Sequence, residues 1–144
     1  MKEPISFYVE GDPKGQPRAR ACIRGKHAGV YDPGTADAWK IAVAEAWRHV
    51  RTEPFTGAVS LSLRFYFQRP KSHFGTGNNS RIVKRSAPLR HTTTPDCDNL
   101  AKAVMDVLTR LGAWNDDCQV NELKIQRHWV ERAPGCAIRI SESE

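Results

Sequence analysis

One amphipathic helix with clear ends constrains the fold of this 144-residue chain more than any other feature. Either Asp98 or Asn99 can accept hydrogen bonds from its first free amides, and Gly112 supplies a left-handed end. A helix with a single apolar face must be covered by another layer of structure. The residues of that face recur at i, i+3, i+4, i+7, i+8 and i+11, and they are Leu100, Ala103, Val104, Val107, Leu108 and Leu111.

Alternation of apolar and polar residues predicts the strands of the covering layer. We expect strands over residues 5–9, 59–67, 123–129 and 136–140, and a turn at 133–135 that joins the last two as a hairpin. A second helical stripe predicts a helix over residues 36–51, capped by Thr35, with Trp39 and Trp47 in the core rather than in a base-stacking surface. The order strand, helix, strand, helix, strand, strand predicts one α+β domain over residues 1–144, in which a mixed β-sheet is covered by two helices.

Charged residues cluster around the helix that precedes Gly112. Pro95 biases the preceding residue toward an extended backbone, so Asp96 and Asp98 should project the same way. Lys102 and Asp106 follow Asp98 at intervals of four residues and should line the polar face of the helix with it. The sequence therefore predicts two neighbouring carboxylates with a lysine one turn away.

Two more carboxylates, Asp116 and Asp117, follow the helix at the mouth of the next strand. Oxygen ligands of this kind select Mg²⁺ or Mn²⁺, which keep open positions for a substrate phosphate. A metal held this way can activate a water and neutralise charge on a phosphodiester. The competing interpretation is that Asp98 only caps the helix and that Asp116 and Asp117 only form a turn. A helix of about 12 residues is about 18 Å long, so Asp117 needs a return path to reach Asp96.

Basic residues fall in two segments that contain no acidic residue and that flank the carboxylates. The formal net charge is +6, and this distribution favours contact with the phosphates of a nucleic acid, although charged loops can also be merely solvated. The expected DNA-binding residues are Lys14, Arg18, Arg20, Arg24 and Lys26 in the first segment, and Arg69, Lys71, Arg81, Lys84, Arg85 and Arg90 in the second.

Residues 69–93 show no periodicity and are expected to form a long loop without regular structure. We expect this loop to be mobile without DNA and to fold over a strand or cross-over when DNA binds. The alternative is disorder without a function.

Several features favour a cytoplasmic protein that does not enter a membrane. No stretch approaches the length of a membrane span, and the first residues lack the pattern of a signal peptide. The four cysteines are widely spaced and form no C-x-x-C pair, which favours reduced thiols over a zinc site.

The segment from Pro95 to Lys102, with the later Trp114 to Val120, resembles the signature of the RusA family of Holliday junction resolvases. The shared pattern is D-x-D-N-L-x-K followed by D-D-x-Q-V, and residues 11–20 also resemble a glycine-proline-arginine segment of phage-type members. The resemblance implies an Mg²⁺-dependent endodeoxyribonuclease, with Mn²⁺ as a substitute, which acts as a homodimer on four-way DNA junctions. It also implies a phage or prophage origin.

The same resemblance implies roles for individual residues. Asp96, Asp98 and Asp117 match the family's essential acidic positions, which hold the metal, and Lys102 matches its essential lysine. Asp106 and Asp116 match positions whose role the resemblance leaves open. The match is poorest at residues 69–93, where members of the family can have a much shorter connection.

Two other functions are compatible with the residues alone. One is a metal-dependent nuclease that cuts flaps or forks, and the other is a non-catalytic DNA-binding protein whose carboxylates only cap and turn. A four-way junction needs two opposed cuts, so a two-fold dimer is the simplest arrangement for the resolvase.

Overall fold

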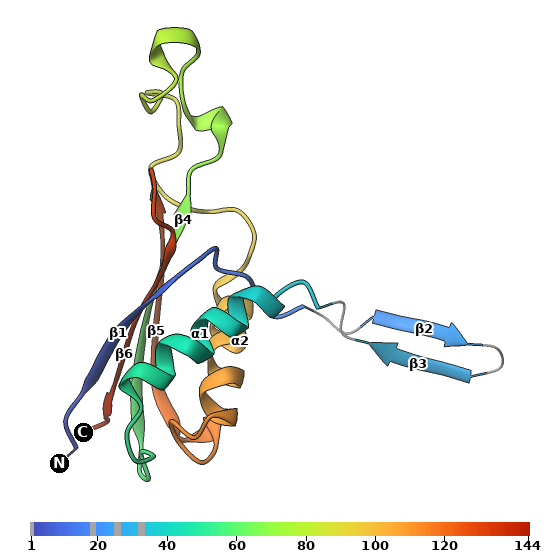
Figure 1. The fold of residues 1–144 in the computed structure, drawn as a ribbon, viewed down its shortest axis with the longest axis vertical. Coiled ribbons are helices and arrows are strands. Elements are labelled where there is room, and N and C mark those ends of the chain that lie inside the picture. The colour runs from blue at the N-terminus through green and yellow to red at the C-terminus, as the bar shows by residue number, and fades with distance from the viewer. Residues whose placement is uncertain (1, 18–19, 25–26, 32–33) are drawn as a thin grey trace.

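The computed structural model describes residues 2–17, 20–24, 27–31 and 34–144, and of residues 20–24 and 27–31 it describes only the backbone. Figure 1 shows the order of the elements. The strands and helices are β1 (Ile5–Glu10), β2 (Arg20–Arg24), β3 (His27–Tyr31), α1 (Asp37–Val50), β4 (Val59–Gln68), α2 (Cys97–Arg110), β5 (Val120–Val130) and β6 (Gly135–Glu142). Three short 3₁₀ turns are η1 (Lys71–His73), η2 (Gly77–Asn79) and η3 (Asp117–Gln119).

The main sheet has four strands in the order β1-β6-β4-β5. β4 and β5 are parallel, with Leu63 opposite Ile125, because α2 carries the chain back across the sheet between them. β6 is antiparallel to both β4 and β1. The predicted mixed sheet with two helices is confirmed, but the predicted hairpin of the last two strands is wrong: β5 and β6 lie on opposite sides of β4 and do not pair.

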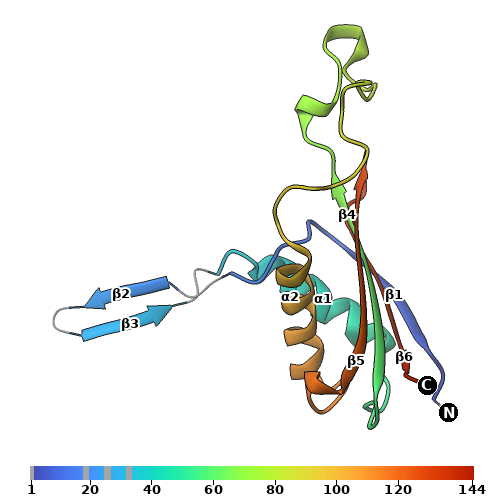
Figure 2. The same ribbon diagram turned by 180° about the vertical axis from the view of Figure 1, so that it is seen from behind.

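Both helices cover the same face of this sheet (Figures 1 and 2). Trp39, Val43 and Trp47 on α1 are buried, and the ring centroid of Trp47 lies 6.0 Å from that of Phe7 on β1. The prediction that both tryptophans belong to the core is therefore confirmed. The buried residues of α2 are the predicted stripe with the addition of Ala101 and without Leu111, which is half-buried.

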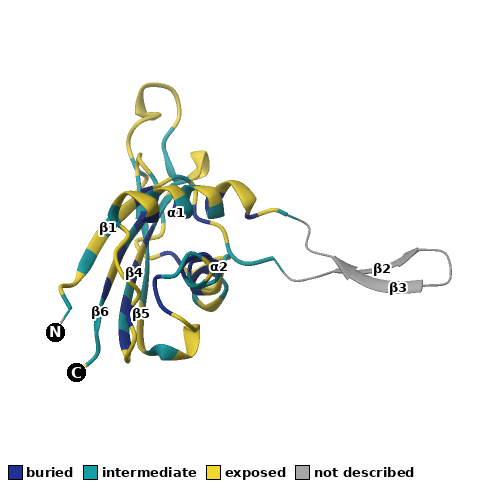
Figure 3. Ribbon diagram, turned by 60° about the horizontal axis from the view of Figure 1, so that its bottom comes forward, coloured by how far each residue is buried: buried dark blue, intermediate teal, exposed yellow. Residues whose placement is uncertain are grey.

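The uncovered face of the sheet is polar, as the alternation along β4 requires. Leu61, Leu63 and Phe65 are at most 1% exposed toward the helices, whereas the intervening Arg64 is exposed on the other face. Figure 3 shows the buried residues on the strands and on the helix sides that face them.

The ends of the helices differ in part from the prediction. The N-cap of α1 is Ala36, which has no side-chain cap, so the assignment of Thr35 as the cap is wrong. The predicted stop of α2 is confirmed, because Gly112 has a φ of 82°. The amide of Ala113 then donates to the carbonyl of Leu108 at 2.9 Å, which is the hydrogen bond of a left-handed helix end.

Residues 69–93 contain more structure than the sequence predicted. The amide of Gly75 donates to the carbonyl of Ile82 and that of Lys84 to the carbonyl of His73, both at 2.9 Å, around an antiparallel bridge between Phe74 and Val83. The sequence does not predict this small hairpin, because its hydrogen bonds join main-chain groups and its side chains show no alternation of apolar and polar residues. The sequence also did not predict β2, which pairs with β3 in a separate two-stranded ribbon (Figure 1).

Among the described residues, no helix is long and apolar enough to cross a bilayer. In the described part of the chain, Cys97, Cys118 and Cys136 are free cysteines.

Candidate active site

Asp96 and Asp98 lie together at the N-terminal end of α2. Asp96 is the N-cap, with an extended backbone, and its side chain makes no capping hydrogen bond. The Thr94–Pro95 peptide before it is cis, and Asp98 lies in the first helical turn. The prediction that Asp98 or Asn99 caps the helix is therefore wrong, because the helix begins earlier, at Cys97. Both carboxylate-bearing residues are exposed and Cys97 is half-buried.

The segment after β1 packs against this end of α2. The amide of Gln16 donates to the carbonyl of Asn99 at 2.9 Å. A Cβ added to Gly15 would lie 3.1 Å from the Cβ of Asn99 and 3.2 Å from that of Pro95, so glycine allows the two segments to approach closely. The exposed Lys14 is thereby brought to the same end of the helix as Asp96.

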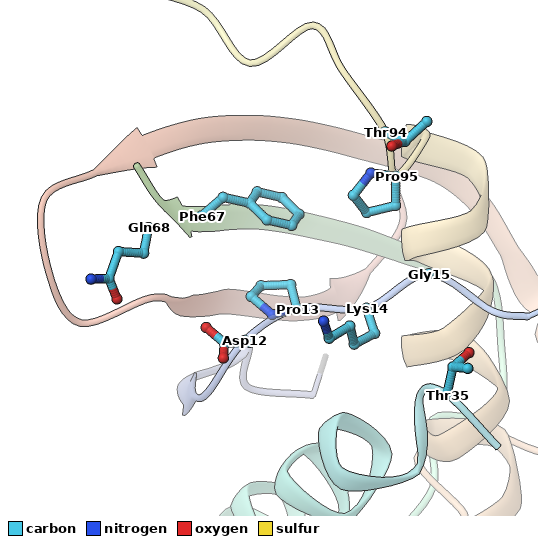
Figure 4. Close-up of a pocket in the computed structure, with 9 residues that line it drawn as sticks. All are labelled: Asp12, Pro13, Lys14, Gly15, Thr35, Phe67, Gln68, Thr94 and Pro95. Atoms are coloured by element: carbon cyan, nitrogen blue, oxygen red, sulfur yellow. The ribbon is translucent and has the colours of Figure 1, made fainter. Parts of the chain in front are cut away.

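An open hollow of about 380 Å³ lies beside this helix end. In Figure 4, the segment from Asp12 to Gly15, the end of β4 and the Thr94–Pro95 segment surround it. Its polar side chains include Lys14, Asp12 and Gln68, and its apolar wall includes Phe67. The hollow therefore lies next to the residues that immediately precede Asp96.

The polar face of α2 carries Lys102 and Asp106, as predicted. The ammonium nitrogen of Lys102 lies 3.8 Å from a carboxylate oxygen of Asp106, and the Lys102 side chain is 62% exposed. This pair joins i and i+4 on a helix surface, where such contacts are weak. Lys102 can leave Asp106 for a phosphate at little cost in free energy.

Asp116 and Asp117 lie beyond the other end of α2. Asp116 is the N-cap of η3, and its carboxylate accepts a hydrogen bond from the amide of Cys118 at 2.9 Å. This bond holds the pKa of Asp116 below its usual range. Asp117 follows as an exposed residue. The role that the resemblance left open for Asp116 has a structural explanation, since this side chain orders the turn that presents Asp117.

Gln119 fixes the same turn to the body of the protein. Its side-chain oxygen accepts from the amides of Asn115 and Asp116, at 2.8 and 3.0 Å. Its side-chain nitrogen donates to the carbonyls of Phe55 and Gly57, both at 2.9 Å. Sequence reasoning assigned no role to Gln119. Its signal was present, because an acidic residue followed by glutamine three positions later is the pattern of a capping box.

The structure does not bring Asp117 to Asp96 within one chain. The 14-residue α2 separates them, which corresponds to about 21 Å. β5 gives a second measure. Val120 lies next to η3 and Arg127 contacts Pro95, and the rise along the strand between these two residues is about 23 Å. Among the described residues, no three His, Cys, Asp or Glu side chains form a group that could hold a metal. A single chain therefore does not bring the three carboxylates together, because Asp117 comes shortly after the C-terminal end of α2 and the chain does not run back to the N-terminal end before it.

The donor chemistry at the N-terminal end of α2 nevertheless fits Mg²⁺. Asp96 and Asp98 are exposed neighbours, and the Asp96 carboxylate makes no cap to the helix. Mg²⁺ is often held by one or two carboxylates together with waters and substrate phosphates. These two side chains can supply such a pair.

Most of the predicted DNA-binding residues in the second basic segment are exposed, and these are Lys71, Arg81, Lys84, Arg85 and Arg90. Arg69 is half-buried and donates to the carbonyl of Pro88 at 2.8 Å, so it also holds the segment together. In the first segment, Lys14 is exposed. Arg18 and Lys26 lie outside the described residues, and Arg20 and Arg24 are described only as backbone of β2.

An aromatic cluster anchors the second basic segment to the ends of β4 and β5. The ring of His91 stacks on Trp129 at 4.2 Å and contacts Phe67 at 4.4 Å, and His73 meets the edge of Trp129 at 4.9 Å. Burial, and then the charge of Arg127, lower the pKa of His91. The segment is therefore fixed at its base, immediately before the residues that lead to Asp96.

Comparison with known proteins shows which family the chain belongs to. The family model of endodeoxyribonuclease RusA matches residues 10–141. The chain is also 37% identical over 142 residues to the uncharacterized protein YqaN of Bacillus subtilis (strain 168), and the match covers 96% of both chains. The matched residues include both ends of α2 and both basic segments. The chain belongs to the RusA family of endodeoxyribonucleases.

Proposed function

We propose that this protein is an Mg²⁺-dependent endonuclease that resolves four-way DNA junctions by paired cuts. The observation that carries the proposal is the pair of exposed, uncapped carboxylates at the start of α2, set between basic segments in a chain of this family. The RusA family implies Holliday junctions as the substrate. The proposal adds the metal, the residues that act and the assembly.

Asp96 and Asp98 would hold the metal at the scissile phosphate. When bound there, Mg²⁺ would supply positive charge at the phosphate and favour deprotonation of the attacking water. Lys102 lies on the same helix, one turn beyond Asp98, and its ammonium group donates to a phosphate oxygen or orients the attacking water. Attack in line expels the 3′ oxygen, so the products carry a 5′-phosphate and a 3′-hydroxyl.

Asp117 reaches this centre from a second copy of the chain. A two-fold axis across the middle of α2 sets two copies of the helix antiparallel, with the N-terminal end of each beside the C-terminal end of the other. Asp117 of the partner subunit then lies near Asp96 and Asp98. A two-fold homodimer therefore carries two centres, which matches the two opposed cuts that a junction requires.

The basic segments hold the arms of the junction. The exposed lysines and arginines of residues 69–93 neutralise phosphates without reading bases, as structure-selective binding needs. When DNA binds, residues 69–93 close over one DNA strand or over the cross-over of the junction. Lys14 contacts the backbone nearest the centre.

The test incubates the protein with labelled four-way junction, fork, flap and linear duplex, with Mg²⁺ or with chelator, beside Asp96→Asn. We expect paired nicks in the junction that require Mg²⁺ and wild-type Asp96. If forks or flaps are cut in preference to the four-way junction, they are the substrate instead. Binding with no cut in any DNA would leave only a DNA-binding protein.

A further inference from the structure

Arg127 occupies a position on β5 where the alternation along the strand calls for an apolar residue. It lies opposite Phe65, one of the core residues of β4, and therefore faces the helices rather than the solvent side of the sheet. Its side chain is half-buried. Arginine is placed in such surroundings only when its charge and its donors have partners.

The partners of Arg127 all belong to the five residues before Asp96. A single guanidinium nitrogen, Nη1, lies 2.5 Å from the carbonyl oxygen of Thr93 and 3.0 Å from that of Pro95. The same nitrogen lies 3.2 Å from Nδ1 of His91. Nη1 carries two hydrogens for the two carbonyls, and it can also donate to Nδ1 of His91 when that nitrogen carries no proton; a charged donor strengthens each such bond.

The position of Asp96 depends on this main-chain segment. Its carboxylate makes no bond to the helix that it caps, and on the C-terminal side its carbonyl accepts from the amide of Leu100 at 3.1 Å. On the N-terminal side, Arg127 holds the carbonyls of Thr93 and Pro95. The main chain is therefore held on both sides of Asp96, by α2 on one side and by Arg127 on the other.

Arg127 also joins this segment to the basic segment of residues 69–93. His91, 5% exposed, lies near the end of that segment and is held between Phe67 and Trp129. One guanidinium thus contacts both the base of the DNA-binding segment and the residues that lead to the carboxylate.

We propose that Arg127 is a positioning residue for the reaction: it holds the Thr93–Pro95 main chain so that Asp96 points to the metal and the scissile phosphate. This inference rests on the proposed function. Residues that orient metal ligands, when mutated, typically lower activity or metal affinity about 10- to 100-fold.

The test compares Arg127→Gln and Arg127→Lys with Arg139→Gln, a control that removes an exposed arginine from the uncovered face of the sheet. For Arg127→Gln we expect kcat for junction cleavage to fall about 10- to 100-fold, while the Kd for junction in chelator changes less than about 2-fold. Amide hydrogen exchange at Asp96–Asn99 should quicken, and exchange in β6 should not change. For Arg127→Lys, kcat and the exchange rates should lie between those of the wild type and those of Arg127→Gln, because lysine keeps a cationic donor but lacks the planar guanidinium group. Arg139→Gln should match the wild type in every measurement.

Wild-type kcat and wild-type exchange at Asp96–Asn99 in Arg127→Gln would overturn the inference. So would faster exchange throughout the sheet in step with the loss of kcat, because that result indicates a general role in stability. If Arg127→Gln does not fold, the same comparison is made with Arg127→Lys. Failure of the wild type to cut any DNA would remove the proposed function, whereas the exchange measurement on Arg127 would still decide whether it holds the segment.

Discussion

A mixture of two inactive variants tests whether each catalytic centre is built from two chains. In the proposed two-fold homodimer, Asp96→Asn and Asp117→Asn should each inactivate both centres. In a mixed dimer, one centre receives both substitutions and the other receives neither. Activity should therefore return when the two inactive proteins exchange subunits.

The separation along α2 sets the size of this effect. About 21 Å between the two helix ends is far more than the few ångströms that separate ligands of one ion, so a single chain cannot complement itself. Random exchange makes half of the dimers mixed, and half of the centres in those are intact. The mixture should therefore show about a quarter of the wild-type rate of nicking. The products should be singly nicked junctions rather than resolved duplexes.

The assay follows nicking of a labelled junction after the two variants are denatured and refolded together. A mixture of Asp96→Asn and Asp98→Asn is the matched control, since both substitutions lie at the same end of α2 and no mixed dimer regains an intact centre. No activity in the Asp96→Asn and Asp117→Asn mixture, with mixed dimers demonstrated by distinct tags, would refute the reasoning.

Three further predictions concern the lysine, the basic segment and the buried histidine. Lys102→Met should slow cleavage by about 100-fold and leave junction affinity unchanged, measured by single-turnover kinetics and by binding in chelator; equal losses of both would contradict its role at the phosphate. Replacing Lys84 and Arg85 with Gln should weaken junction binding and reduce the slope of log K against log salt by about 2, measured by fluorescence anisotropy; an unchanged slope would exclude these residues from the interface. Because the pKa of His91 is lowered, the unfolded chain binds its proton first, so the free energy of unfolding should be fully present above pH of about 6.5 and fall as pH decreases below it. Protonation also removes the acceptor for Arg127, so urea titrations across this range should show a pH dependence that is reduced in His91→Gln and would contradict the account if it were identical there.

The helices could be predicted from sequence because their signals are local. Trp39 and Trp47 lie on one stripe of α1 and are both buried, and Gly112 ends α2 in the left-handed conformation. Each of these features depends on residues within a few positions along the chain, so periodicity and end signals identify it without knowledge of the fold.

The neighbours of the strands could not be predicted in the same way. The alternation along β5 indicates which side chains face the core, but it does not indicate whether β4 or β6 lies next to β5. The parallel pairing of β4 with β5 follows from the path of α2 across the sheet, and β6 then takes the other side of β4. That choice is made by contacts between distant segments.

The site shows the same difference between features that depend on local sequence and features that depend on distant contacts. The sequence places Asp98, Lys102 and Asp106 on one side of α2, and the Lys102–Asp106 pair agrees with this. The sequence already puts about 18 Å of helix between Asp96 and Asp117, but it does not reveal whether the fold brings them back together, because that depends on contacts between distant segments. Arg127 was missed because its acceptors are 32 to 36 residues earlier in the chain and two of the three are main-chain carbonyls, which have no signature in a sequence.

Diffraction from crystals of the protein soaked with Mn²⁺, recorded for anomalous scattering from manganese, tests the central claim most directly. We expect one ion at each end of the dimer, about 2.1 Å from carboxylate oxygens of Asp96 and Asp98 of one protomer and of Asp117 of the partner subunit. An ion held only by carboxylates of one chain, or no ion near Asp96 at a concentration that supports cleavage, would contradict the account.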